Sequence, residues 1–136
     1  DGKNTKGYGH LLNMAINFPV QSLASDVTGS ALVDVEAAIL DEYDLDYVQY
    51  FQLLIDYRKN LLTGAPGCVI MEPRMPLLIN EVHDSLLLDI PPSDKKKVTE
   101  LVVETMRSVP SLKKLVTNFS CPLDVEVLTG THWGGA

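Results

Sequence analysis

The sequence has few cysteines for disulfide bonds and no long apolar run that could span a membrane. Cys68 and Cys121 are the only cysteines among 136 residues. Two are too few for a disulfide framework, so a reduced compartment, taken as the cytoplasm, is expected. No run of about eighteen apolar residues occurs, and no membrane partner is expected. The N-terminal stretch DGKNTKGYGH has no apolar signal-peptide core and does not begin with Met. The chain is therefore expected to be a piece of a longer protein.

Basic residues are also scarce. Lys and Arg total 11 against 18 Asp and Glu, and the formal net charge is −7. Because neutralising phosphates requires Lys and Arg, this charge alone argues against an autonomous nucleic-acid-binding protein. The acids gather within residues 41–46 and the lysines at residues 95–97. Each run is interpreted as a solvated face.

The hydrophobic pattern predicts two helices in the first half of the chain. A helix is predicted over about 19–40, opened by Pro19, with the alternative of an earlier start and a kink at that proline. Its apolar positions follow helical spacing: Val20, Leu23, Ala24, Val27, Ala31 and Leu32. A second helix, rich in Tyr, Phe and Leu, is predicted over about 45–62 and ends at Thr63-Gly64.

The second half of the chain predicts mainly strands. Short apolar runs predict strands at 68–71, 77–82 and 86–90, then a helix over about 94–108 capped by Ser93, and a final strand over about 122–128. The order α-α-β-β-β-α-β predicts an α+β fold, an antiparallel sheet with helices packed on one face.

The connection between two of these strands carries an ionisable pair, His83-Asp84, in the stretch LLINEVHDSLLLDIP. A carboxylate on a tight turn is held rigidly by both strands. Such a group suits Mg²⁺, which takes one or two protein carboxylates together with phosphate oxygens. The alternative is a polar turn in which Asp84 makes an Asx-type hydrogen bond to the backbone.

Uncharged polar side chains recur every four residues at Asn13, Asn17, Gln21 and Ser25. If the helix runs through Pro19, they share one face. Amides can donate to purine N3 and pyrimidine O2, the minor-groove acceptors common to all base pairs. The alternative is a solvated face that holds amides by coincidence.

Other chemistries find weaker support. The three histidines and two cysteines show no zinc-ligand spacing, and neither a P-loop nor a GxGxxG motif occurs. A small metal-dependent phosphohydrolase could use Asp84 with Glu81 or Asp89. Both acids stand an odd number of residues from Asp84, so regular strands would direct them to the opposite face.

Three stretches together resemble DNA polymerases of family A. The run from Asn17 to Asp26 resembles the N-x-P-x-Q-x-x-A-x-D segment, and Leu78 to Ser85 resembles motif C with its V-H-D turn. Pro122 to Val127, followed by Gly130-Thr131-His132-Trp133, is similar to the closing P-L-x-V-E-V strand and G-x-x-W. The matches keep the family's order over nearly the whole chain.

The resemblance implies that residues 1–136 form the C-terminal portion of a polymerase palm. Asp84 then corresponds to a carboxylate that holds the two catalytic Mg²⁺ ions, and His83 to the histidine near the primer terminus. Asn17 and Gln21 correspond to amides on the minor groove of primer-template DNA, and Asn13 to a template contact. The implied reaction is nucleotidyl transfer from a dNTP to a primer 3′-hydroxyl.

Several departures from the family pattern limit what the chain can do alone. Motif A, with the other metal aspartate, and the fingers helix have no counterpart, so the isolated chain is expected to be inactive without the remaining polymerase subdomains. Ser85 replaces the usual Glu, and Asn13 stands where many relatives have Arg. Residues 41–67 are interpreted as an insertion of the kind found in some phage members. A phage host's cytoplasm and an organelle are both compatible with it. The alternative function is a palm-derived DNA-binding or structural module without catalysis.

Overall fold

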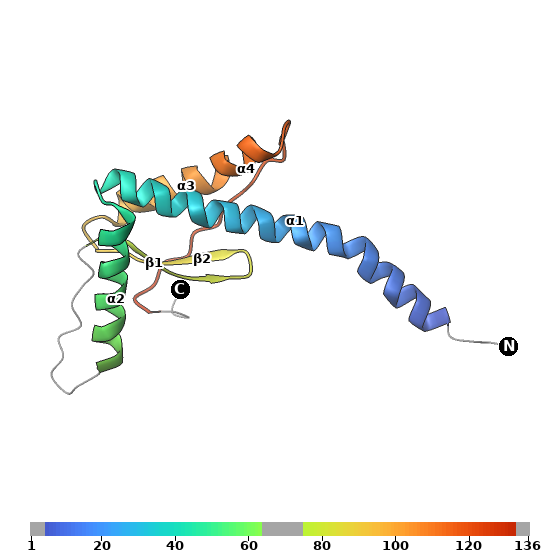
Figure 1. Cartoon of the computed structure of the whole chain (residues 1–136), viewed down its shortest axis with the longest axis horizontal. Coiled ribbons are helices and arrows are strands. Elements are labelled where there is room, and N and C mark those ends of the chain that lie inside the picture. Colours follow the sequence, from blue (N-terminus) through green and yellow to red (C-terminus); the bar gives the residue numbers. More distant parts are fainter. Residues whose placement is uncertain (1–4, 64–74, 133–136) are drawn as a thin grey trace.

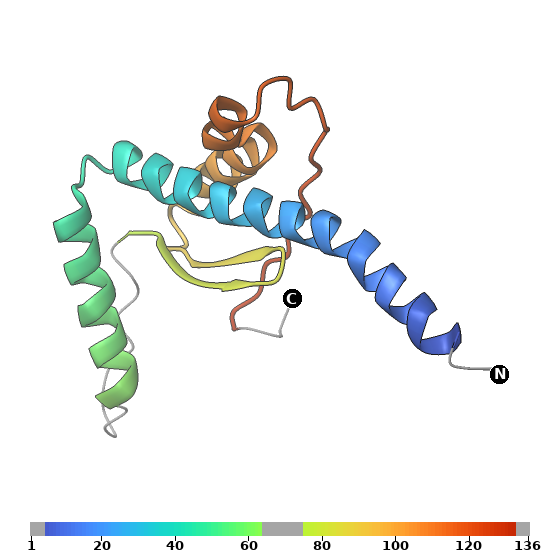
Figure 2. The ribbon, with the colours of Figure 1, turned by 45° about the vertical axis from the view of Figure 1, so that its right-hand side comes forward.

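The computed structural model describes residues 5–63 and 75–132. In chain order these residues form α1 (Thr5–Glu42), α2 (Tyr47–Thr63), β1 (Leu77–Val82), β2 (Ser85–Asp89), α3 (Lys95–Ser108) and α4 (Pro110–Leu115). In Figures 1 and 2, α1, α3 and α4 lie on one side of the β1–β2 hairpin, and α2 stands beside the open end of the hairpin. The α+β class and the antiparallel strand pair predicted from the sequence are confirmed.

The long helix α1 begins well before the predicted start and contains Pro19 in its interior. Of the two sequence interpretations, the helix that runs through the proline is therefore the correct one. Proline has no N–H to donate to the carbonyl four residues earlier, and its ring crowds that carbonyl. The bend of α1 within its N-terminal half is consistent with this local loss (Figure 1).

Only the C-terminal half of α1 is packed in the described part of the chain. The predicted apolar face is buried at Ala31 and half-buried at Val27, but Val20 and Leu23 are 67% and 49% exposed. No described element covers Val20 and Leu23. Nearby exposed apolar side chains are Leu11, Leu12, Met14, Ile16 and Phe18.

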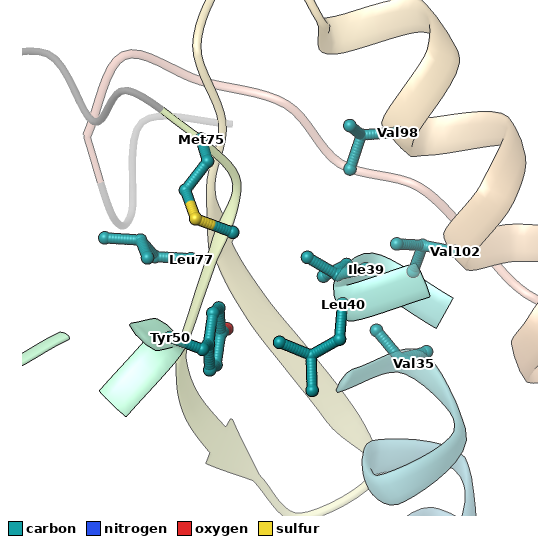
Figure 3. Packing of buried hydrophobic residues seen from close by; sticks show 8 residues of the cluster. All are labelled: Val35, Ile39, Leu40, Tyr50, Met75, Leu77, Val98 and Val102. Atoms are coloured by element: carbon teal, nitrogen blue, oxygen red, sulfur yellow. The ribbon is translucent and has the colours of Figure 1, made fainter. Parts of the chain in front are cut away.

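The main core lies where α1, α2, α3 and the start of β1 meet. Figure 3 shows its side chains converging from these elements: Val35, Ile39, Leu40, Tyr50, Met75, Leu77, Val98 and Val102. Full burial of such a side chain contributes roughly 1.5–3 kcal/mol. The hairpin is attached through the same core, since Leu86 and Leu88 pack against it. A two-stranded hairpin is marginal alone, so this packing holds it in place.

The hairpin contains one irregularity. Leu78 pairs with Leu88 and Asn80 pairs with Leu87, which leaves Ile79 as an extra residue on β1. From Asn80 to the turn the pairing continues without further shifts and closes with Val82 opposite Ser85.

The last third of the chain corrects two predictions. Asp94, and not Ser93, is the N-cap of α3, and neither side chain caps the helix with a hydrogen bond to its backbone. Residues 122–128 are not paired as a strand with any described residue. The sequence has strand propensity there, yet a strand also needs a neighbouring edge to bond. The predicted strand at 68–71 lies outside the described residues.

A short helix, α4, was not predicted. It follows α3 through Val109, a fully buried residue with a positive φ of 36°, and Pro110 occupies its first turn. Val109 and Leu112 pack with Ala31 in a second small core. None of the described helices is long and apolar enough to cross a membrane.

Candidate active site and nucleic-acid interface

The β1–β2 turn is a two-residue loop made of His83 and Asp84. Val82 and Ser85 form the last strand pair, so the two loop residues are fixed by hydrogen-bonded backbone on both sides. His83 has a positive φ of 57°, whereas Asp84 does not. A positive φ at the first loop position is typical of a II′ hairpin turn, where glycine is the usual residue. A histidine therefore occupies a position for which the backbone favours glycine.

The carboxylate of Asp84 is exposed and weakly engaged. Its one hydrogen bond within the described residues is from Ser85 Oγ, at 3.5 Å, the outer limit for such a bond. The alternative derived from the sequence, an Asx-type bond to the backbone, is not seen between described residues. Both oxygens of Asp84 are thus open to a ligand, while the turn restricts where they can move.

A single carboxylate fits part of a magnesium site. Mg²⁺ is commonly held by one or two carboxylates, with waters and substrate phosphate oxygens completing the octahedron. Among residues 5–63 and 75–132, no three His, Cys, Asp or Glu side chains gather closely enough to hold a metal ion. Asp84 can supply one such carboxylate ligand.

Of the two carboxylates considered as partners of Asp84 in a phosphohydrolase, Asp89 lies far from it. Asp89 pairs with Leu77 at the open end of the hairpin, five residues along β2 from the turn, roughly 16 Å at the usual strand rise. It also accepts a hydrogen bond from the Tyr57 hydroxyl. Glu81 is exposed and pairs with Leu86. This arrangement removes Asp89 as a partner of Asp84.

The amide stripe on α1 is exposed along its whole length. Asn13, Asn17 and Gln21 lie at four-residue spacing on one continuous helix, and Ser25 follows. None of the three amides makes a side-chain hydrogen bond with another described residue. Their donors are therefore available to an external acceptor, as a minor-groove contact requires.

The turn and the N-terminal half of α1 lie on the same side of the core (Figures 1 and 2). In both ribbon views the hairpin runs away from α2 in the same direction as the N-terminal half of α1 (Figures 1 and 2). The exposed half of α1 and the turn thus extend from the core in the same direction (Figures 1 and 2). α3 and α4 lie on the other side of α1, away from the turn.

Three tyrosines, Tyr43, Tyr50 and Tyr57, contact the hairpin or the start of α3, and the sequence analysis did not predict these contacts. Tyr50 accepts a hydrogen bond from the Leu78 backbone N–H at 2.9 Å, Tyr57 donates to Asp89, and Tyr43 donates to Asp94 at 2.5 Å. For Tyr50 and Tyr57 the signal was their spacing of seven residues, which places both side chains near one face of α2.

The environment of these hydroxyls favours their protonated form. Burial, and then the hydrogen bond to Asp89, raises the pKa of Tyr57 to about 12. Burial first and Asp94 second raise the pKa of Tyr43, and the same hydrogen bond lowers the pKa of Asp94. Burial raises the pKa of Tyr50, partly offset by the Leu78 N–H. All three hydroxyls are therefore neutral at physiological pH.

Comparisons with known proteins give one match. The family model described as DNA polymerase family A matches residues 2–135, almost the entire chain. No curated protein and no solved structure gives a significant match.

Proposed function

Because the chain belongs to DNA polymerase family A, we propose that it is the C-terminal palm portion of a DNA polymerase that extends a primer by two-metal nucleotidyl transfer. The observation that carries the proposal is the Asp84 carboxylate, exposed on a two-residue turn that both strands hold fixed. In this reaction a primer 3′-hydroxyl attacks the α-phosphate of a dNTP, and pyrophosphate leaves.

Asp84 is the residue of this chain that would hold Mg²⁺. When bound, the metal ions stabilise charge on the transferring phosphate and lower the pKa of the attacking hydroxyl. The protein's part is to keep the carboxylate at a fixed place, and the hairpin meets that requirement. His83 stands next to it on the same turn, where its exposed ring can contact the primer terminus.

The amides of α1 would bind the duplex that the reaction extends. Asn17 and Gln21 donate to acceptors in the minor groove of primer-template DNA, and Asn13 contacts the template strand. These side chains carry no charge, so they sense groove shape and base-pair geometry without adding a salt-dependent term. The net charge of −7 agrees with a minor-groove role for this chain, since the basic surface that binds the phosphates then lies in other subdomains.

The remaining polymerase subdomains, on the same or another chain, would complete the site. They supply motif A, with the second metal-binding carboxylate, and the fingers that grip the dNTP. The exposed apolar side chains of α1, from Leu11 to Leu23, offer a surface on which such a subdomain can pack. The isolated chain is not expected to polymerise. The cytoplasm, including that of a phage host, is the proposed place of action.

The test is primer extension by the complete native protein, or by this chain together with the chain that carries motif A. Asp84→Asn keeps the size of the side chain but removes the charge that binds metal. We expect a loss of about a thousandfold or more, with primer-template affinity retained. Asp41→Asn, an exposed carboxylate at the end of α1, is the matched control and should leave the rate unchanged.

The two other outcomes decide against the proposal in different ways. Equal extension by wild type and Asp84→Asn would show that this carboxylate holds no catalytic metal. DNA binding without extension in either form would instead assign the chain to the alternative, a palm-derived binding module without catalysis.

A further inference from the structure

The helix α2 makes two hydrogen bonds to the open end of the hairpin, one to each strand. Tyr50 accepts the backbone N–H of Leu78 on β1, and Tyr57 donates to the carboxylate of Asp89 on β2. In the hairpin register Leu77 pairs with Asp89 and Leu78 with Leu88, so both anchored residues lie at the end farthest from the turn. Figure 2 shows this end of the hairpin beside α2, with the turn directed away.

The two tyrosines lie on one helix, and Tyr50 is held in the core. They are seven residues apart on α2, two helical turns, so they project from nearly the same face. Tyr50 is 1% exposed and is enclosed by the core side chains Ile39, Leu40 and Leu77 (Figure 3). Its ring cannot move without opening the core, and the strand N–H that it accepts is fixed with it.

A third tyrosine holds the segment that leaves the hairpin. Tyr43 lies between α1 and α2 and donates to Asp94 at the start of α3. Lys97 of α3 lies 5.3 Å from the centre of the Tyr43 ring and also pairs with Glu42. The chain is thus restrained where β1 begins, where β2 ends and where α3 starts.

These restraints determine where the turn points. The turn extends about five residues beyond the anchored end, roughly 16 Å, so a rotation of about 5° at that end moves it by more than 1 Å. Displacements of that size at a reacting centre cost up to about a hundredfold in rate. A hairpin attached only by aliphatic contacts, which have no preferred direction, would not be restrained this tightly.

We propose that α2, in the segment interpreted as an insertion, positions the catalytic turn, and that Tyr50 and Tyr57 are its positioning residues. The inference rests on the proposed polymerase function, since it assigns α2 a role toward Asp84. Both tyrosines bind the end of the hairpin that lies opposite Asp84. Each acts through the hairpin, by fixing one strand at the end opposite the carboxylate.

The experiment removes one hydroxyl at a time in the complete protein and measures primer extension against Mg²⁺ concentration. Tyr57→Phe keeps the ring and deletes the bond to Asp89. We expect kcat to fall about tenfold and half-maximal activity to need several times more Mg²⁺, with Kd for primer-template unchanged. Tyr47→Phe is the matched control, because this α2 tyrosine is 57% exposed; its Mg²⁺ profile should match wild type.

A merely structural role would give a different pattern. Loss of folded protein lowers both the apparent kcat and the amount of bound DNA, in parallel. The Mg²⁺ requirement of the remaining enzyme then stays the same. That pattern in Tyr57→Phe, or a wild-type profile, overturns the inference. Tyr50→Phe repeats the test on β1, and if it fails to fold, Tyr57→Phe decides alone.

Asp84→Asn separates this inference from the function on which it depends. If Asp84→Asn abolishes extension while Tyr57→Phe has a wild-type profile, the polymerase function stands and only the positioning role is wrong. If Asp84→Asn extends primers as wild type does, both proposals fall.

Discussion

Replacing His83 by glycine should separate the stability of the turn from its chemistry. His83 has φ 57°, a left-handed conformation that costs an L-residue roughly 1–2 kcal/mol, less for His than for bulkier types. Glycine avoids this cost but loses roughly 0.5–1 kcal/mol more chain entropy on folding. The ring of His83 makes no hydrogen bond or ion pair with another described residue, so little is lost with it. The hairpin of His83→Gly should therefore be as stable as wild type, or up to about 1 kcal/mol more stable.

The assay is hydrogen exchange of the amides in residues 77–89, measured in the complete protein by mass spectrometry. The free energy of local opening follows from the protection factors. His83→Ala is the control, because alanine also lacks the imidazole but keeps the left-handed cost. It should open more easily than the glycine variant, by about 1 kcal/mol. Primer extension is measured on the same two proteins and should fall in both.

If hairpin stability and primer extension change together in His83→Gly, the stability of the turn and its chemistry are not separable at this position. A glycine variant whose hairpin opens more easily than wild type by over about 1 kcal/mol would mean that the imidazole itself stabilises the turn. Full extension activity in His83→Gly would mean that the ring has no role at the primer terminus. The expected result is a stable hairpin with reduced activity. It would identify His83 as a residue retained for its chemistry despite the backbone strain of its positive φ.

Two further predictions concern the tyrosines and the amide stripe. Stability should decline between pH 10 and 12, because the pKa of Tyr57 is raised from its ordinary 10.0 to about 12 and that of Tyr43 is raised as well. The protonated hydroxyls contribute fully to the free energy of unfolding below pH 10, and this contribution is lost as pH rises through the folded-state pKa. In urea unfolding at pH 9 and 11, Tyr57→Phe should therefore show a smaller decline in stability than wild type. Gln21→Ala should raise Kd for primer-template about tenfold at every sequence tested, with an unchanged salt slope; sequence-dependent or salt-dependent weakening in fluorescence anisotropy would contradict a minor-groove role.

The sequence predicted those features that depend on neighbouring residues. The hairpin followed from two short apolar runs around His83-Asp84, and the four-residue spacing of Asn17 and Gln21 placed them on one exposed face. The second helix was placed to within two residues of α2 at its start and one at its end. These features depend on local propensity and periodicity, which the sequence contains directly.

Features that depend on distant partners could not be predicted in this way. Val20 and Leu23 have the spacing of a core face, yet periodicity does not tell which element will cover them. The final strand was predicted at 122–128 from its composition, but no described strand lies beside it to accept its hydrogen bonds. The bond from Tyr57 to Asp89 joins residues 32 positions apart, a distance at which no local pattern applies.

The extra residue in β1 has a consequence for insertions and deletions in this hairpin. Ile79 stands between Leu78 and Asn80 without a partner on β2, so its deletion would leave every other strand pair intact. Such a bulge adds right-handed twist. Lineages with and without Ile79 should therefore share one ladder but hold the tip of the hairpin at different rotations about its axis.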